Sequence, residues 1–196
     1  VRCIMNPLTG KIKEFVSITE KEGLLSNDVR SIVQDLDGNL WLGTAAGIVM
    51  FNPNDPESKM VSFTSKDGLS SDKITLLVFD ENQNLWIGTK EGINKFSTKK
   101  YYRIIKKFDE MQGELIESRL EKFKHYGFME GFTGSETNIN AVCKDKEGNL
   151  WFGTRRGTMK YVENEDRINK IPPSIRIDGI HVFSERFPAE DKMKLF

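Results

Sequence analysis

The segment DENQNLWIGTKEGINKF, residues 80–96, holds a tryptophan, a Gly-Thr pair and a second glycine within one short apolar run. The same pattern recurs as DLDGNLWLGTAAGIVMF at 35–51 and as DKEGNLWFGTRRGTMKY at 145–161. A pattern that occurs three times in one chain indicates a repeat architecture, because each unit buries its apolar face against the next. The repeat therefore decides the fold before any question of chemistry arises.

Each unit has the signals of four short strands separated by turn residues. In the second unit the apolar run ITLLVF, 74–79, is followed by LWIG and then by INKF. The fourth strand is visible in the first unit as KMVSFT, 59–64. Asp37-Gly38 suits a tight turn with positive φ between the first two strands, and Asn82 and Asn84 are expected to serve the second unit.

The tryptophans are 45 and then 65 residues apart, which fits four-stranded propeller blades with about twenty extra residues in the second unit. Trp side chains at such repeated positions are expected to act as wedges between blades. We expect the repeated residues to form the structural core of the blades: Trp41, Trp86, Trp151, Gly43, Gly88 and Gly153.

The units GLLSNDVRSIVQDLDGNLWLGTAAGIVMF (23–51) and GLSSDKITLLVFDENQNLWIGTKEGINKF (68–96) resemble the two-component regulator propeller repeat. The third unit, 131–161, resembles a variant in which Ser135-Glu136 replaces Ser-Asn. The segment IPPSIRIDGIHVF, 171–183, resembles the start of the immunoglobulin-like domain that follows such propellers. The resemblance implies the extracytoplasmic sensor region of a bacterial hybrid histidine kinase, many of which respond to polysaccharide breakdown products.

The expected fold is all-β: a partial β-propeller of about three four-stranded blades and one orphan outer strand, then the first strands of a β-sandwich. The orphan strand is predicted in NPLTGKIKEFVSIT, 6–19. Closed propellers usually have four to eight blades, so this chain is not expected to close a ring alone. The expected boundaries are a propeller segment at 1–170, with blades at about 23–64, 68–125 and 126–170, and an immunoglobulin-like start at 171–196.

The second blade carries an insertion at about 99–124. Within it, 108–123 places apolar residues near helical spacing, but Gly113 weakens that pattern. A helix and a β-extension both remain open. The chain begins at Val1 and shows no signal peptide, so it is expected to be cut from a longer protein.

In an antiparallel meander, the turns between second and third strands share one face with the connections between blades. Loops held by a rigid scaffold usually carry recognition. Arg155 and Arg156 suit an acidic or sulfated ligand because guanidinium pairs bidentately with such groups, although solvated turn arginines are the plainer alternative. The expected ligand-binding residues are Asp72, Lys90, Glu91, Glu136, Asn138, Arg155 and Arg156.

Several classes of function are excluded by the same sequence. The 29 basic and 29 acidic residues balance, so neither nucleic acid nor membrane binding is expected. The spacing Asp35-x-Asp37-x-Asn39 is similar to that of the ligands in a calcium-binding loop. An EF-hand loop needs glycine at the position of Leu40, so no metal is expected. No motif of a nucleophile, zinc site or cofactor cradle occurs, and neither catalysis nor a cofactor is expected.

The two cysteines, Cys3 and Cys143, lack metal-ligand spacing. Two buried free thiols are expected, with one disulfide as the alternative.

The resemblance thus implies a non-catalytic ligand-sensing segment on the periplasmic side of the inner membrane, in a membrane-anchored histidine kinase. An oligosaccharide ligand would change the packing of two protomers. The alternative is a structural or adhesive module that presents surfaces to protein partners. Self-association through the open blade edges, as a homodimer or larger assembly, is expected in either case.

Overall fold

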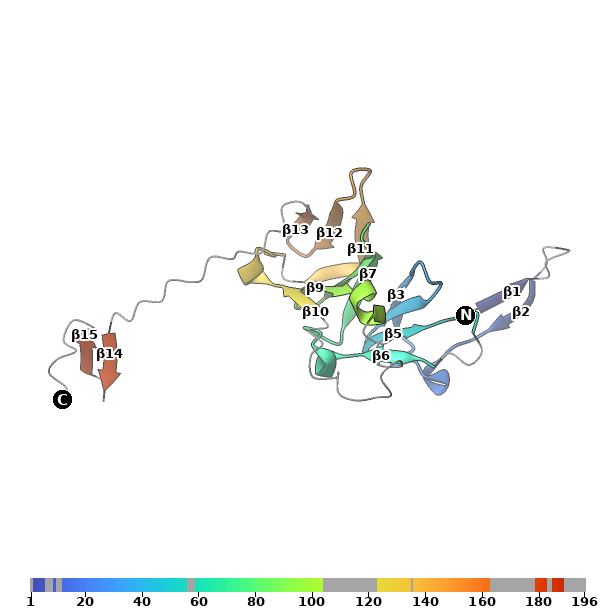
Figure 1. Ribbon diagram of the computed structural model, residues 1–196, viewed down its shortest axis with the longest axis horizontal. Helices are drawn as coiled ribbons and strands as arrows, with labels where there is room; N and C mark the ends of the chain where they lie inside the picture. The colour runs from blue at the N-terminus through green and yellow to red at the C-terminus, as the bar shows by residue number, and fades with distance from the viewer. Residues whose placement is uncertain are drawn as a thin grey trace. The chain divides into compact units, whose positions relative to one another are not determined.

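The computed structural model describes residues 2–5, 9, 12–55, 59–103, 123–134, 136–162, 179–182 and 185–188. The chain divides into two compact units, Val1–Val162 and Glu163–Phe196. The first unit contains three antiparallel sheets in sequence order and an N-terminal hairpin (Figure 1). The predicted boundaries at 170 and 171 stay predictions.

The first blade is a four-stranded meander of β3 (Val29–Gln34), β4 (Leu40–Thr44), β5 (Gly47–Phe51) and β6 (Val61–Phe63). Consecutive strands pair antiparallel in the order β3-β4-β5-β6. The short turns allow only neighbours in sequence to pair. The predicted fourth strand within 59–64 is confirmed.

The second blade repeats this meander with β7 (Ile74–Phe79), β8 (Asn84–Thr89), β9 (Gly92–Ser97) and β10 (Phe123–Tyr126). Its outer strand, β10, follows the insertion and pairs with β9 over Phe123–Tyr126. The insertion therefore lengthens the link between the third and fourth strands and leaves the blade intact.

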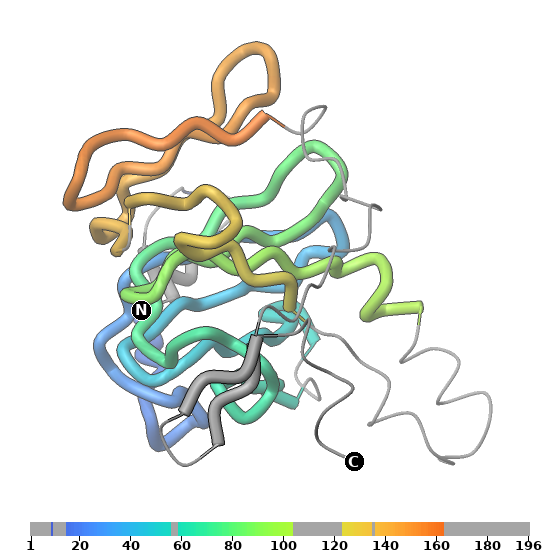
Figure 2. The backbone as a smooth tube through the Cα atoms, turned by 90° about the vertical axis from the view of Figure 1, so that its left-hand side faces the viewer, coloured from blue at the N-terminus to red at the C-terminus, as the bar shows by residue number. Residues whose placement is uncertain are grey.

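The third sheet contains β11 (Thr137–Lys144), β12 (Leu150–Thr154) and β13 (Gly157–Tyr161) among the described residues. Within the first unit, β7 lies between β3 and β11, the first strands of the two other sheets. The blue, green and orange parts of the tube follow one another in the same order (Figure 2). Consecutive blades thus stack through their first strands, and the predicted β-propeller architecture is confirmed.

The N-terminal segment differs from the single orphan strand predicted for it. β1 (Arg2–Met5) pairs antiparallel with β2 (Ile12–Val16) in a hairpin. The residues before the expected strand were not recognised because four residues are too few to show an alternating pattern. In the second unit, β14 (Gly179–Val182) and β15 (Glu185–Pro188) form another antiparallel hairpin, and its place in an immunoglobulin-like domain stays a prediction.

The turn between the first and second strands corrects one further expectation. Gly38 adopts φ 83° as predicted, but in the second blade the left-handed residue is Gln83, with φ 65°, and not Asn82 or Asn84. Gln83 occupies the position of Gly38 in the repeat. The geometry of the repeat sets the position of positive φ, and it overrides the greater tolerance of asparagine for that conformation.

Aromatic side chains fill the seam between the first and second blades. Trp41 is 1% exposed and stacks on Phe63 with a centroid distance of 5.7 Å. From the second blade, Phe96 contacts both rings, at 5.7 Å from Trp41 and 5.5 Å from Phe63. Such clusters stabilise through the large apolar area that each ring removes from water.

Trp86 fills the seam between the second and third blades in the same way. It is 1% exposed, stacks on Tyr126 and lies 4.2 Å from the ring centroid of Tyr161. Trp151, at the same position of the third blade, is only half-buried. The burial of each tryptophan therefore depends on the blade that follows it.

Gly43 and Gly88 allow the blades to approach closely. A Cβ atom on Gly43 would lie 2.7 Å from Cγ2 of Ile74, and one on Gly88 would lie 2.5 Å from Oγ1 of Thr137. Both neighbours belong to the first strand of the following blade. The glycine two residues after the tryptophan is thus required by the seam in the first and second blades.

The start of the insertion seals the seam between the first two blades. Residues 98–103 form a helical turn after β9. Tyr101 from this turn is buried between Phe63 and Phe96, at centroid distances of 5.5 and 5.4 Å. The segment 108–123, for which a helix or a β-extension was expected, lies outside the described residues except for Phe123, which begins β10.

The expectation of buried thiols is wrong for Cys143, which is a free and exposed cysteine. Cys143 pairs with Trp151 across β11 and β12, as Val33 pairs with Trp41 in the first blade. Val33 is covered by the second blade, whereas Cys143 lies on the outer side of the third. The side chain of Cys3 lies outside the described residues.

Replacing Trp86 with alanine should lower the free energy of unfolding by about 3–5 kcal/mol, because it empties a fully buried aromatic site. Trp151→Ala should cost clearly less, since part of that ring is already in contact with water. Chemical denaturation followed by circular dichroism measures both. Equal losses for the two variants would contradict the wedge role of Trp86.

Candidate functional site

The turns between the second and third strands of each blade share one geometry. Thr89 Oγ1 donates a hydrogen bond to the carbonyl of Gly92 and accepts one from the backbone N–H of Glu91. Thr44 and Thr154 make the equivalent bonds in the other blades. In the second and third blades, the two central residues of this Gly-Thr-x-x-Gly turn are exposed and charged.

Three of the expected ligand residues meet across the seam between the second and third blades. Glu136 accepts a hydrogen-bonded ion pair from Nε of Arg155 at 2.9 Å and lies 3.9 Å from Nζ of Lys90. The backbone carbonyl of Glu136 also accepts the N–H of Arg155 at 3.2 Å. Lys90 comes from the second blade and the other two residues from the third, so the cluster spans both.

The charge cluster, which we define as Lys90, Glu136, Arg155 and the adjacent Arg156, has three cations and one carboxylate. The Glu136 side chain is 21% exposed, whereas that of Arg155 is 71% exposed. Exposed ion pairs contribute only about 0–1 kcal/mol, so Arg155 can exchange Glu136 for an anionic ligand at low cost. The charge cluster thus has more cations than carboxylates, and its binding of an anionic ligand stays a prediction.

The remaining expected ligand residues lie apart from this arrangement. Asp72 accepts hydrogen bonds from the backbone N–H and the hydroxyl of Ser65, at 2.6 and 3.2 Å, and so braces the 3₁₀ turn η2 (Ser65–Asp67) between blades. Glu91 and Asn138 have exposed side chains, as does Arg156 of the charge cluster. The carbonyl of Glu91 bonds Nε2 of His125 at 2.8 Å. Asp72 therefore braces the turn, and ligand contact by Asp72 and by the three exposed residues stays a prediction.

The turns with calcium-like spacing use their oxygens within the blade. Asp35 Oδ1 accepts the backbone N–H of Asp37 and of Asn39, at 3.0 and 2.9 Å. Its Oδ2 accepts the indole N–H of Trp41 at 2.9 Å. Asp80 and Asp145 bind the indoles of their own blades in the same way, both at 2.8 Å.

We name this arrangement the Asp–Trp latch: one carboxylate closes the first turn of the blade and holds the tryptophan of the next strand. Because the latch occupies both carboxylate oxygens of each Asp, the spacing has a structural explanation. In the described part of the chain, no group of three or more candidate ligand side chains is placed to hold a metal ion.

The latch lowers the pKa of Asp35 and of Asp145. Burial alone would raise the pKa of Asp35, but hydrogen bonds from Trp41, Tyr102 and Asn39 outweigh it and hold the pKa below its usual value. The hydrogen bond from Trp151, together with those from Asn149, lowers the pKa of Asp145 to about 2. In both blades the latch thus favours the ionised form.

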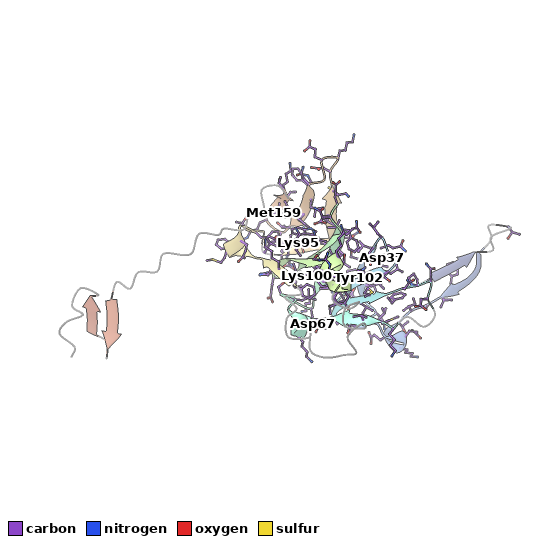
Figure 3. All side chains as sticks on the ribbon, in the orientation of Figure 1. Asp37, Asp67, Lys95, Lys100, Tyr102 and Met159 are labelled. Atoms are coloured by element: carbon purple, nitrogen blue, oxygen red, sulfur yellow. The ribbon has the colours of Figure 1, made fainter. Side chains whose placement is uncertain are left out.

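Tyr102 makes a contact between blades that the sequence did not reveal. Its hydroxyl donates to Asp35 Oδ2 at 2.7 Å and accepts from Nδ2 of Asn39 at 2.9 Å. Tyr102 belongs to the second blade's insertion and reaches the first blade's turn, where it lies beside Asp37 (Figure 3). Burial and the Asp35 carboxylate raise the pKa of Tyr102 above its ordinary value. In the sequence, only the two adjacent tyrosines at 101–102 could have indicated this contact between the insertion and the first blade.

Comparison with protein families identifies the three units. The family model of the two-component regulator propeller matches residues 23–46, 68–91 and 133–156. A search of curated proteins found no match.

Comparison with solved structures identifies the same architecture. The chain resembles the extracellular domain of a hybrid two component system from B. thetaiotaomicron, with 22% identity, a TM-score of 0.63 and 96% of this chain covered. It also resembles the extracellular domain of a one component system from B. thetaiotaomicron, with 17% identity, a TM-score of 0.56 and 83% of this chain covered. The chain corresponds to 24% and 20% of those two chains, and these similarities show a shared fold.

The latch predicts how stability depends on pH. An aspartate in an unfolded chain has a pKa of about 3.9, above the folded value of about 2 for Asp145. The unfolded state therefore takes up the proton first, and the latch's stabilisation is complete above about pH 4 and is lost as the pH falls toward about 2.

Asp145→Asn should reduce stability at neutral pH and flatten the decline below about pH 4, because the titrating group is gone. Urea denaturation at a series of pH values measures both effects. Asp37→Asn is the matched control, since Asp37 occupies the exposed position of the same turn motif. An unchanged pH profile for Asp145→Asn would contradict the role of the latch.

Proposed function

Because this chain carries three two-component regulator propeller repeats, we propose that it is a ligand-sensing segment of an extracytoplasmic receptor domain. The segment recognises its ligand without chemistry of its own, and the kinase activity belongs to another part of the parent protein. No helix among the described residues is long and apolar enough to span a membrane. The periplasmic side of the inner membrane is the proposed location.

The charge cluster across the second seam is the observation that carries this proposal. Its cations are fixed on two-residue turns of a stacked scaffold, which reduces the ordering cost of binding. Arg155 and Arg156 present guanidinium groups that match the carboxylates and sulfates of acidic sugars. We propose an acidic or sulfated oligosaccharide as the ligand.

The position of the cluster supports a route for the signal. A ligand that draws Arg155 away from Glu136 also alters the contact of Glu136 with Lys90 on the neighbouring blade. The ligand then favours one packing of the two blades, provided that its affinity for the two packings differs. Rearrangement of a receptor dimer would transmit this difference across the membrane.

A structural or adhesive role is the second candidate function. Phe128 and Met129 are 72% and 90% exposed in the turn η4 (Phe128–Glu130), at the connection between the second and third blades. The equivalent turns of the other blades carry charged or polar residues there, Glu20-Lys21 and Ser65-Lys66. Exposed apolar side chains of this kind favour a protein partner.

Calorimetric titration of this chain with a sulfated or uronic-acid oligosaccharide, and with a neutral one of equal length, tests the proposal. Acidic sugar should bind and neutral sugar should not. Arg155→Ala with Arg156→Ala should weaken binding about tenfold or more, since each charge-assisted hydrogen bond contributes about 1.5–3 kcal/mol. Lys66→Ala removes an exposed cation from another turn and should leave the affinity unchanged.

Two outcomes would count against the sensor proposal. Equal loss of affinity in the arginine and Lys66 variants would indicate nonspecific attraction of anions. Failure of every sugar to bind, together with capture of a protein partner that depends on Phe128 and Met129, would favour the adhesive function.

A further inference from the structure

The connection between the second and third blades exposes two apolar side chains on the face that carries the charge cluster. Phe128 and Met129 begin the turn η4 and are 72% and 90% exposed. Their equivalents in the turn η2 are Ser65 and Lys66, so the structure of the turn does not require apolar residues at these positions. Adjacent exposed apolar side chains on such a connection indicate a binding surface.

The exposure of the two side chains belongs to their position in the repeat. The turn η2 has a four-stranded blade on each side, and its Ser65 and Lys66 are exposed as well. The stacking of blades therefore leaves the first two residues of such a turn uncovered. Phe128 and Met129 occupy the same two positions between the second and third blades.

The turn holds its apolar side chains on a fixed support. The carboxylate of Glu130 accepts the backbone N–H of Gly127 at 2.8 Å, and the N–H of Gly131 donates to the carbonyl of Phe128 at 3.2 Å. Gly131 closes the turn with φ 89°, and the next residue, Phe132, is buried between the second and third blades. The backbone of Phe128 is thus ordered before a ligand binds, which lowers the cost of binding.

The turn η4 lies against the turn that carries Lys90 of the charge cluster. A Cβ atom on Gly92 would lie 2.5 Å from the carbonyl oxygen of Tyr126 and 3.5 Å from Cα of Gly127. The Cα atoms of Lys90 and Phe128 are therefore at most about 16 Å apart, since consecutive Cα atoms are separated by about 3.8 Å. An extended ligand can reach both the cations and the aromatic ring.

The extent of the apolar surface favours a sugar over a protein partner. A stable protein interface buries about 800 Å² on each partner and involves about 20–30 residues a side. A single aromatic ring, in contrast, matches the apolar face of one sugar ring, whose C–H groups can pack on it. Because the adjoining cations suit the acidic groups of an oligosaccharide, the ring of Phe128 suits a neighbouring unit of the same ligand.

We infer that Phe128 is the stacking platform for a sugar ring, so that the ligand surface extends from the charge cluster to the turn η4. The ligand pairs its acidic groups with Arg155 and Lys90 and places the apolar face of another sugar unit on Phe128. This inference rests on the proposed sensing function. It adds recognition of the uncharged part of the ligand, which the cations alone do not supply.

Calorimetric titration of the 196-residue chain with a sulfated tetrasaccharide tests the inference. Phe128→Ala should weaken binding about threefold to tenfold, because part of one aromatic side chain loses its contact with the ligand. Phe128→Tyr keeps the flat ring and should bind as the unchanged chain does. Phe128→Leu keeps an apolar side chain without a flat face, and should lose as much affinity as the alanine variant.

Leu36→Ala is the matched control, since Leu36 is 82% exposed in the turn between β3 and β4 and its replacement should leave the affinity unchanged. Higher salt should reduce the effect of Arg155→Ala and preserve that of Phe128→Ala, because only interactions between charges are screened. Phe128 is largely exposed, so circular dichroism should show an unchanged fold for each of its variants.

Three outcomes would overturn the inference. Binding that Arg155→Ala weakens and Phe128→Ala leaves unchanged would do so while leaving the proposed sensing function in place. Failure of the chain to bind any acidic sugar would overturn both. Capture of a protein partner that depends on Phe128, together with sugar binding that does not, would assign the turn η4 to an adhesive surface.

Discussion

The rest of the structure depends on the hydrogen bonds of a single carboxylate in each blade. This carboxylate accepts backbone N–H groups of the first turn with one oxygen and the indole N–H of the next strand with the other. A buried indole N–H without a partner would cost free energy, so the latch allows the tryptophan to be a wedge. Turn, strand register and seam are thereby coupled in one interaction.

The stacking of the blades then determines how far each repeated residue is buried. Trp41 and Trp86 are both 1% exposed, while Trp151 in the same latch is half-buried. Ile32 and Leu77 differ in the same way, and Cys143 is exposed where Val33 and Val78 are packed. In a repeat protein each unit contacts only its neighbours, so the neighbour sets the burial of a position.

Function is proposed at the seams for the same reason. Lys90 comes from one blade and Glu136 and Arg155 from the next, so the charge cluster exists only when the blades are stacked. A surface assembled from two rigid units responds to their relative packing, which a loop within one unit cannot report.

The sequence by itself determined the repeat, the strands and the propeller architecture, because four apolar segments, a Gly-Thr turn and a tryptophan recur in register. It also placed Lys90, Glu136 and Arg155 on one face, since a meander alternates its turns. Only the tertiary structure decided that Asp72 braces a turn, that Gln83 takes the left-handed conformation and that Tyr102 reaches Asp35. Periodicity encodes contacts within a unit, whereas contacts between units depend on distances that no local pattern contains.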